Sequence, residues 1–102
     1  MNDITVHELK QKLDNKEDFI FIDVREPMEY EMYNLKAKLI PLNTLPNHLD
    51  ELEDFKNSEI VVHCRSGMRS ATAKQILVNH GFTNVKNLLG GVLAWQEAFE
   101  KI

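Results

Sequence analysis

Hydrophobic and polar positions follow two rhythms along this chain, one typical of buried strands and one typical of helices. Residues 19–24 and 59–63 form nearly continuous apolar runs, and residues 39–42 and 85–88 form shorter extended ones. An uninterrupted run of this kind suits a strand that is covered on both faces, as in a parallel sheet. The pattern therefore predicts four short strands.

Between these runs, apolar residues recur every three or four positions, as they do along one face of a helix. The predicted helices cover residues 6–15, 27–32, 45–55, 69–80 and 92–99. Thr5 and Glu8 have the spacing of a capping box for the first of them. Pro27 suits the first position of the second helix, and Gly81 suits a left-handed cap after the fourth.

The third helix is expected to begin after Thr44 as its cap, with Leu45, Leu49 and Leu52 facing inward. Its acidic residues read as a solvated face and not as a metal site.

Strands and helices alternate throughout, which indicates an α/β fold with a central, mostly parallel sheet. The length of 102 residues allows one domain, over residues 1–102, and is too short for two. In such open sheets, ligands bind beyond the carboxyl ends of the strands. Cys64 follows one predicted strand and Asp23 to Arg25 end another, so both can face one crevice.

Composition narrows the function classes. The net charge of −4, with no basic run, argues against nucleic acid as the main ligand. No apolar run approaches the roughly 18 residues that a membrane span requires, and the N-terminus lacks the pattern of a signal peptide. A single cysteine excludes an internal disulfide. The cytoplasm is therefore the expected location.

The segment from His63 to Ser70 carries the candidate chemistry, because it places Cys64 between a buried strand and the start of a helix. We call residues 64–69 the cysteine loop. Backbone N–H groups in such a turn have no internal partners and converge on an anion. The thiol should then ionise below the usual pKa of about 8.5. Gly67 permits tight curling, which leaves room for a persulfide on the sulfur.

Arginine is concentrated near this loop. The chain has only three arginines: Arg65 and Arg69 flank Gly67, and Arg25 follows the first strand. The planar guanidinium suits the binding of oxyanions. His63 precedes the thiol on the strand and is expected to point away from it, as a packing residue.

Three segments resemble single-domain rhodaneses, a family of small sulfurtransferases. They are Asp23-Val24-Arg25-Glu26-Pro27 with Glu29-Tyr30, then residues 61–70, and finally Leu89-Gly90-Gly91-Val92-Leu93-Ala94-Trp95. Their order and spacing match over nearly the whole chain. The resemblance implies a rhodanese-like domain with helices on both faces of the sheet. It also implies transfer of a sulfane sulfur from a thiosulfate-like anion to cyanide, a thiol or a partner protein.

In this interpretation Cys64 is the catalytic nucleophile and carries the persulfide. The donor and the persulfide are bound by the rest of the loop, namely Arg65, Ser66, Gly67, Met68 and Arg69. Asp23 and Arg25 are expected to support the neighbouring loop more than to touch substrate. No metal or organic cofactor is needed. Since there is no second cysteine, the acceptor must come from outside the chain.

One segment departs from the family pattern. Small rhodaneses commonly carry Gly-His-Ile and then Gly-Ala after the Glu-Tyr pair, whereas this chain has residues 33–38, Tyr-Asn-Leu-Lys-Ala-Lys. The departure concerns the rim of the pocket and hence the acceptor, and Tyr33 is a candidate to line the entrance.

Two other functions stay open. Phosphatases and arsenate reductases related to this fold use Cys-x5-Arg, one residue longer, which fits a tetrahedral oxyanion. The shorter Cys-x4-Arg spacing from Cys64 to Arg69 disfavours that chemistry. The fold also serves as a protein-interaction module, and a persulfide carrier with little free turnover would lie between the two.

Overall fold

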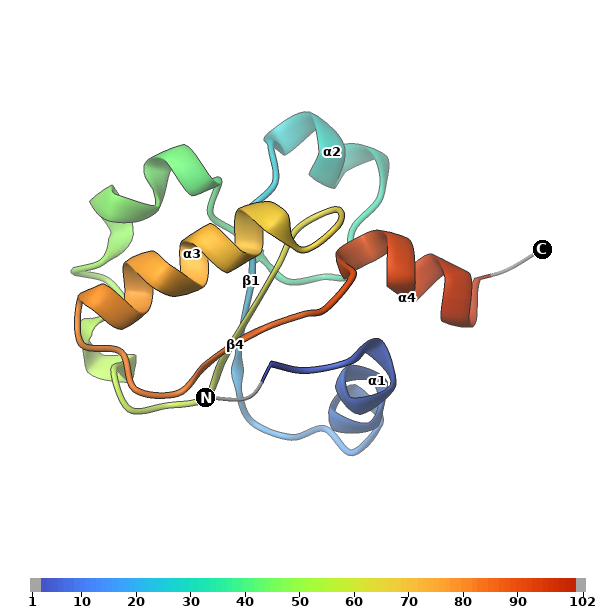
Figure 1. Cartoon of the computed structure of the whole chain (residues 1–102), viewed down its shortest axis with the longest axis horizontal. Helices are drawn as coiled ribbons and strands as arrows, with labels where there is room; N and C mark the ends of the chain where they lie inside the picture. Colours follow the sequence, from blue (N-terminus) through green and yellow to red (C-terminus); the bar gives the residue numbers. More distant parts are fainter. Residues whose placement is uncertain (1–2, 101–102) are drawn as a thin grey trace.

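A four-stranded sheet, parallel throughout, forms the centre of the computed structural model, which describes residues 3–100 (Figure 1). Its strands run in the order β2-β1-β3-β4. Their bounds are β1 Ile20–Asp23, β2 Lys38–Leu39, β3 Ile60–His63 and β4 Val85–Asn87. The predicted α/β fold with a parallel sheet is therefore confirmed.

Helical segments cover both faces of this sheet (Figure 1). Helices α1 (Val6–Asp14) and α4 (Gly91–Phe99) pack on one face, around Leu9, Val61 and Leu88. The other face carries α3 (Met68–Asn79) and two 3-10 segments, η1 (Leu42–His48) and η2 (Glu53–Phe55). Successive residues of β3 point to opposite faces of the sheet. Val61 packs in the core under α1 and α4, and Val62 packs in the core under α3. Within residues 3–100 no helix is long and apolar enough to cross a membrane.

Local signals set most helix ends. Thr5 and Glu8 form the expected capping box of α1, and Pro27 starts the short helix α2 (Pro27–Met32). Gly81 follows α3 with a φ of +91°, which confirms the predicted left-handed cap.

The helix predicted for residues 45–55 is wrong. The chain instead forms η1 and η2, which are closed by tighter bonds between residues three apart. The segment begins at Leu42, earlier than predicted, so Pro46 lies beyond the first turn, where its missing N–H disfavours an α-helix. Thr44 does not cap a helix, because its hydroxyl donates to the Pro41 carbonyl at 2.9 Å. The prediction that leucines of this segment face inward is confirmed for Leu45 and Leu52, which are buried.

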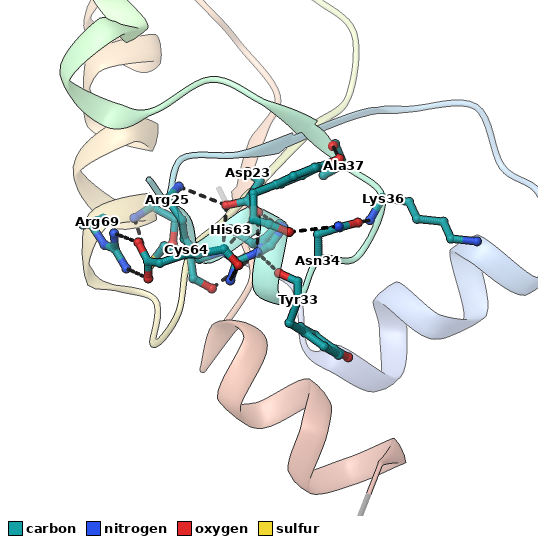
Figure 2. Close-up of polar contacts among 12 residues, drawn as sticks. Asp23, Arg25, Tyr33, Asn34, Lys36, Ala37, His63, Cys64 and Arg69 are labelled. Atoms are coloured by element: carbon teal, nitrogen blue, oxygen red, sulfur yellow. Dashed lines mark hydrogen bonds and ion pairs between the residues drawn. The ribbon is translucent and has the colours of Figure 1, made fainter. Parts of the chain in front are cut away.

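The carboxyl ends of β1 and β3 lie side by side, because Asp23 pairs with His63 in the strand register. The Val24 N–H also donates to the His63 carbonyl at 3.0 Å. The chain therefore leaves both strands at the same edge of the sheet, as expected, which brings Arg25 and Cys64 into one neighbourhood (Figure 2).

Candidate active site

The sulfur of Cys64 lies at the convergence of three donors. The Gly67 N–H lies 3.1 Å from Sγ, and the N–H and the hydroxyl of Ser70 each lie at 3.4 Å. Cys64 is a buried, free cysteine directly after β3. The donors belong to the turn and the first residues of α3, as expected for a helix N-terminus.

These donors change the acidity of the thiol. Burial raises the pKa of Cys64, because it disfavours the charged thiolate. The hydrogen bonds from Ser70, Gly67 and the Ser66 backbone act against burial and outweigh it, so that the pKa lies below its ordinary value. The loop therefore favours the nucleophilic form of the cysteine.

Two glycines allow the cysteine loop to close. Gly67 directly precedes α3 and has a φ of +104°. Residues with L side chains avoid this conformation. Gly91 approaches the loop so closely that a Cβ there would lie 2.4 Å from the Cys64 carbonyl oxygen and 2.6 Å from that of Arg65. The Gly90-Gly91 pair is thus more than a tight turn, because it lets α4 touch the loop backbone.

The first N–H groups of α4 complete this contact. Val92 donates to the Cys64 carbonyl and Leu93 to the Arg65 carbonyl, each at 3.0 Å. The start of one helix therefore binds the outward carbonyls of the loop, while the start of α3 binds the sulfur. The loop is held from both sides.

The outer part of the loop faces solvent. Arg65, Ser66 and Met68 are exposed, and Met68 has 79% of its surface accessible. Among residues 3–100, no carboxylate forms an ion pair with Arg65. Within the described residues, Arg65 is thus an exposed cation without a carboxylate partner, next to Cys64 in the sequence.

Arg69 is placed differently. Its two terminal nitrogens donate to both oxygens of Glu29 on α2, at 2.7 and 2.9 Å (Figure 2). The hydrogen bonds from Arg69 lower the pKa of Glu29 to about 2. This bidentate pair ties the cysteine loop to α2.

Asp23 and Arg25 form a buried pair at the end of β1. The guanidinium of Arg25 donates to both carboxylate oxygens of Asp23, with Nε to Oδ1 at 3.0 Å and Nη2 to Oδ2 at 2.8 Å. It also reaches the backbone carbonyls of Tyr33, at 2.7 Å, and Glu29, at 3.4 Å. Arg25 therefore connects β1 to the segment that contains α2, as Figure 2 shows.

His63 is fully buried against the ring of Phe21, with centroids 5.2 Å apart. Its Nδ1 lies 3.3 Å from the Cys64 carbonyl and its Nε2 lies 3.6 Å from Asp23 Oδ2. Burial lowers the pKa of His63, although Asp23 acts in the opposite direction. This agrees with the expected packing role, and no contact joins its ring to the sulfur.

The divergent segment 33–38 closes on itself. The Tyr30 hydroxyl donates to the Ala37 carbonyl at 2.7 Å, and Asn34 Oδ1 accepts from the Lys36 N–H at 2.8 Å. The Tyr33 hydroxyl hydrogen-bonds Glu100, after α4. Burial and then this bond raise the pKa of Tyr33 to about 12. Contrary to expectation, the Tyr33 ring points away from Cys64 (Figure 2).

Sequence reasoning missed four contributors to the site. Glu29, Ser70, Asn87 and Gly91 all contact the cysteine loop or its residues. Asn87 carried a usable signal, since a polar residue in a buried strand needs a partner. Ser70 directly follows the cysteine loop, whereas Glu29 and Gly91 come from segments that are far from it in the sequence.

A model of the rhodanese-like domain matches residues 5–98 of this chain. The chain belongs to the rhodanese-like family. A sulfurtransferase of Allochromatium vinosum is 34% identical to it over 96 residues, which cover 93% of the chain and 88% of that protein. The crystal structure of a rhodanese-like domain protein from Staphylococcus aureus is 39% identical, with a TM-score of 0.79. That alignment covers 93% of this chain and 91% of the other.

The rhodanese-like domain also occurs within longer relatives. A Bacillus subtilis protein named as a sulfur carrier, YrkF, is 35% identical over 91% of this chain, which spans only 50% of YrkF. The family thus includes proteins named as sulfurtransferases and as sulfur carriers.

The close approach of Gly91 yields a first prediction. Gly91→Ala places a methyl group against two loop carbonyls, so we expect a loss of about 3–4 kcal/mol in unfolding free energy and slower alkylation of Cys64 by iodoacetamide. The matched control is Gly81→Ala, also at positive φ, where the new Cβ meets only the Lys56 side chain at 3.5 Å. That variant should lose about 1–2 kcal/mol and keep the reactivity of Cys64. Equal reactivity in both variants would contradict a role for Gly91 in shaping the loop.

The Glu29–Arg69 pair yields a second prediction. Because the folded pKa of Glu29, about 2, lies below its ordinary value of 4.5, its stabilising effect is complete above pH 4.5 and is lost as the pH falls towards 2. Glu29→Gln should lower the unfolding free energy at pH 7 by about 1 kcal/mol, since solvent screens the pair. The deficit should shrink below pH 4.5 in urea titrations. Glu31→Gln, an exposed position on the same helix, is the control, and a deficit that persists unchanged to pH 2 refutes the assignment.

Proposed function

We propose that this protein transfers a sulfane sulfur from a thiosulfate-like donor to an external acceptor through a persulfide on Cys64. The observation that carries the proposal is the convergence of the Gly67 and Ser70 donors on Sγ. These neutral donors stabilise an anionic sulfur without a metal or an organic cofactor. The family membership supports the same reaction class.

In the first step, the Cys64 thiolate attacks the outer sulfur of thiosulfate. A new S–S bond forms, the bond between that sulfur and the sulfonate breaks, and sulfite leaves with the electron pair. The negative charge then rests on the outer sulfur of the persulfide. The N–H groups of the cysteine loop, from Arg65 through Ser66, Gly67 and Met68 to Arg69, are proposed to hold it.

In the second step, cyanide or a thiol attacks the outer sulfur and the thiolate returns. Cys64 is the only cysteine in the chain, so the protein cannot release its persulfide as an internal disulfide. The acceptor is therefore a separate molecule. A lone reactive thiol of this kind suits a reducing compartment, which we take to be the cytoplasm.

The two arginines of the loop are proposed to have different roles, Arg65 in attracting the donor and Arg69 in holding the loop. Arg65 is exposed and unpaired within the described residues, so it attracts the donor dianion. The charge of Arg69 is largely offset by Glu29, and its main task is to hold the loop against α2 while its remaining surface faces the substrate. Asp23 and Arg25 support this arrangement, since Arg25 binds the backbone of the α2 segment.

A persulfide carrier is a second candidate, favoured by the similarity to the protein named as a sulfur carrier. The same persulfide would form, but it would pass to one partner protein and react slowly with small acceptors. The two functions therefore differ only in the second step.

Mass spectrometry tests the shared first step. After incubation with thiosulfate, the intact protein should gain the mass of one sulfur atom, and cyanide should remove it with formation of thiocyanate. Cys64→Ser should show no gain. Rapid turnover with cyanide supports the sulfurtransferase, whereas sulfur uptake followed by slow removal by cyanide supports the carrier. Absence of sulfur uptake, together with hydrolysis of a phosphate ester, would overturn both.

The division between the arginines is tested by kinetics. Arg65→Ala should raise KM for thiosulfate about tenfold at low salt, as expected for about 1.4 kcal/mol of lost attraction, and leave kcat nearly unchanged. The difference from wild type should shrink as ionic strength rises. Lys10→Ala removes the same unit of charge from α1 and should leave KM unchanged. An unaltered KM in Arg65→Ala would remove Arg65 from donor binding.

A further inference from the structure

Asn87 reaches the cysteine loop from β4 through both ends of its side-chain amide. Its Oδ1 accepts a hydrogen bond from the Ser70 hydroxyl at 2.5 Å, and its Nδ2 donates to the Gly67 carbonyl at 3.1 Å. Asn87 is buried, with 6% of its surface accessible. The two residues that it binds are the same two that donate to the sulfur of Cys64.

The backbone of Asn87 is anchored independently of the loop. It lies in β4, in register with Val62 of β3, and its N–H donates to the Asp3 carboxylate at 3.0 Å. An amide presents two donors on nitrogen and only acceptors on oxygen. Because the Gly67 carbonyl can only accept, the nitrogen end of the amide faces Gly67 and the oxygen end faces the Ser70 hydroxyl.

We propose that Asn87 is a positioning residue for the reactive sulfur, acting through Gly67 and through Ser70. The Gly67 carbonyl also accepts from the Ala71 N–H of α3 at 3.1 Å. The bond from Asn87 adds a contact to β4 that holds the turn with the Gly67 N–H aimed at Sγ. The bond to Ser70 sets the direction of the Ser70 hydroxyl hydrogen. The inference rests on the proposed function in that it takes Cys64 as the nucleophile.

The bond to Ser70 opposes the bond to Gly67 in its effect on the thiolate. The Ser70 hydroxyl has one hydrogen and two acceptors within reach, Sγ at 3.4 Å and Asn87 Oδ1 at 2.5 Å. When Cys64 is a thiolate, the sulfur competes for this hydrogen. When Cys64 carries a persulfide, the charge lies on the outer sulfur, and the hydroxyl can return to Asn87. Asn87 thus provides an alternative acceptor for the hydroxyl during the reaction cycle.

Charged and titratable groups surround Cys64 on several elements, and the test must keep them constant. The cysteine loop contributes Arg65 and Arg69, and the end of β3 contributes His63. Glu29 on α2 and the Asp23–Arg25 pair after β1 complete the set. Replacing Asn87 by alanine alters no charge, so any shift in the acidity of Cys64 reflects the donors.

The experiment measures the pH dependence of Cys64 alkylation by iodoacetamide, which reports the pKa of the thiol without any sulfur donor. In Asn87→Ala, loss of the Gly67 bond should raise this pKa, while the freed Ser70 hydroxyl turns to Sγ and offsets part of the rise. The expected net shift is about half a unit upward, of the size of one hydrogen bond.

The double variant separates the two routes. In a Ser70→Ala background no hydroxyl is present to compensate, so Asn87→Ala should raise the pKa by about one unit, more than in the wild-type background. This unequal effect is the signature of the proposal. A shift that is absent, downward, or no larger in the Ser70→Ala background would overturn it.

A matched control addresses general destabilisation. Val85→Ala removes a buried apolar side chain from the same strand, two residues away, and that side chain carries no donor or acceptor. It should lower the melting temperature and leave the pKa of Cys64 unchanged. If Val85→Ala shifts the pKa as much as Asn87→Ala does, the proposal is wrong.

A second variant serves if Asn87→Ala does not fold. Asn87→Leu has a similar volume and adds no charge, but it removes both the donor to the Gly67 carbonyl and the acceptor for Ser70. The pKa of Cys64 should rise by about half a unit, as in Asn87→Ala, and an unchanged pKa refutes the proposal. If the pKa of Cys64 shifts as expected but the protein takes up no sulfur from thiosulfate, the proposed function is rejected and this role of Asn87 stands.

Discussion

The chemistry of this site depends on one constraint: the backbone around Cys64 must curl until N–H groups of the following helix point at the sulfur. Such a loop turns several carbonyls outward, and each needs a donor of its own. The first N–H groups of α4 supply two of these donors, and the Gly67 carbonyl accepts from both the Ala71 N–H and the side chain of Asn87. The thiolate is therefore stabilised by neutral dipoles that are fixed in place.

The charges around this loop are mostly paired with one another. Arg69 is joined to Glu29, and Arg25 to Asp23, so two of the three arginines bind parts of the protein to each other. Both pairs hold the segment containing α2 beside the cysteine loop. The paired arginines therefore set the geometry of the site. The third arginine, Arg65, is exposed and can attract a diffusing anion.

Much of the fold followed from the sequence because the strands are short apolar runs and the helix ends carry local signals. Thr5 with Glu8, Pro27 and Gly81 each act on neighbours within a few residues, which is why their effects were predictable. The error at residues 45–55 has a local cause as well, since Pro46 outweighed a helical pattern of leucines. The cysteine loop was recognisable for the same reason, being a contiguous motif.

The contacts that complete the site could not be predicted in this way. Glu29 and Arg69 form a hydrogen bond although they are 40 residues apart in the sequence. Ser70 and Asn87 do so at a separation of 17 residues. Whether a side chain on β4 reaches a loop after β3 depends on the strand register and on how closely α4 can approach. Gly91 shows this most clearly, because its sequence context indicates a turn, whereas its position in the fold demands the absence of a side chain.

The bonds from α4 to the cysteine loop can form only late in synthesis, because α4 is made after the loop. Cys64 is made long before Val92 and Leu93, whose N–H groups hold the carbonyls of Cys64 and Arg65. A growing chain that ends between these points carries a cysteine whose loop has not yet been closed. The loop is then held from one side only, by the donors at the start of α3. It is held from both sides only in the finished domain, when α4 docks.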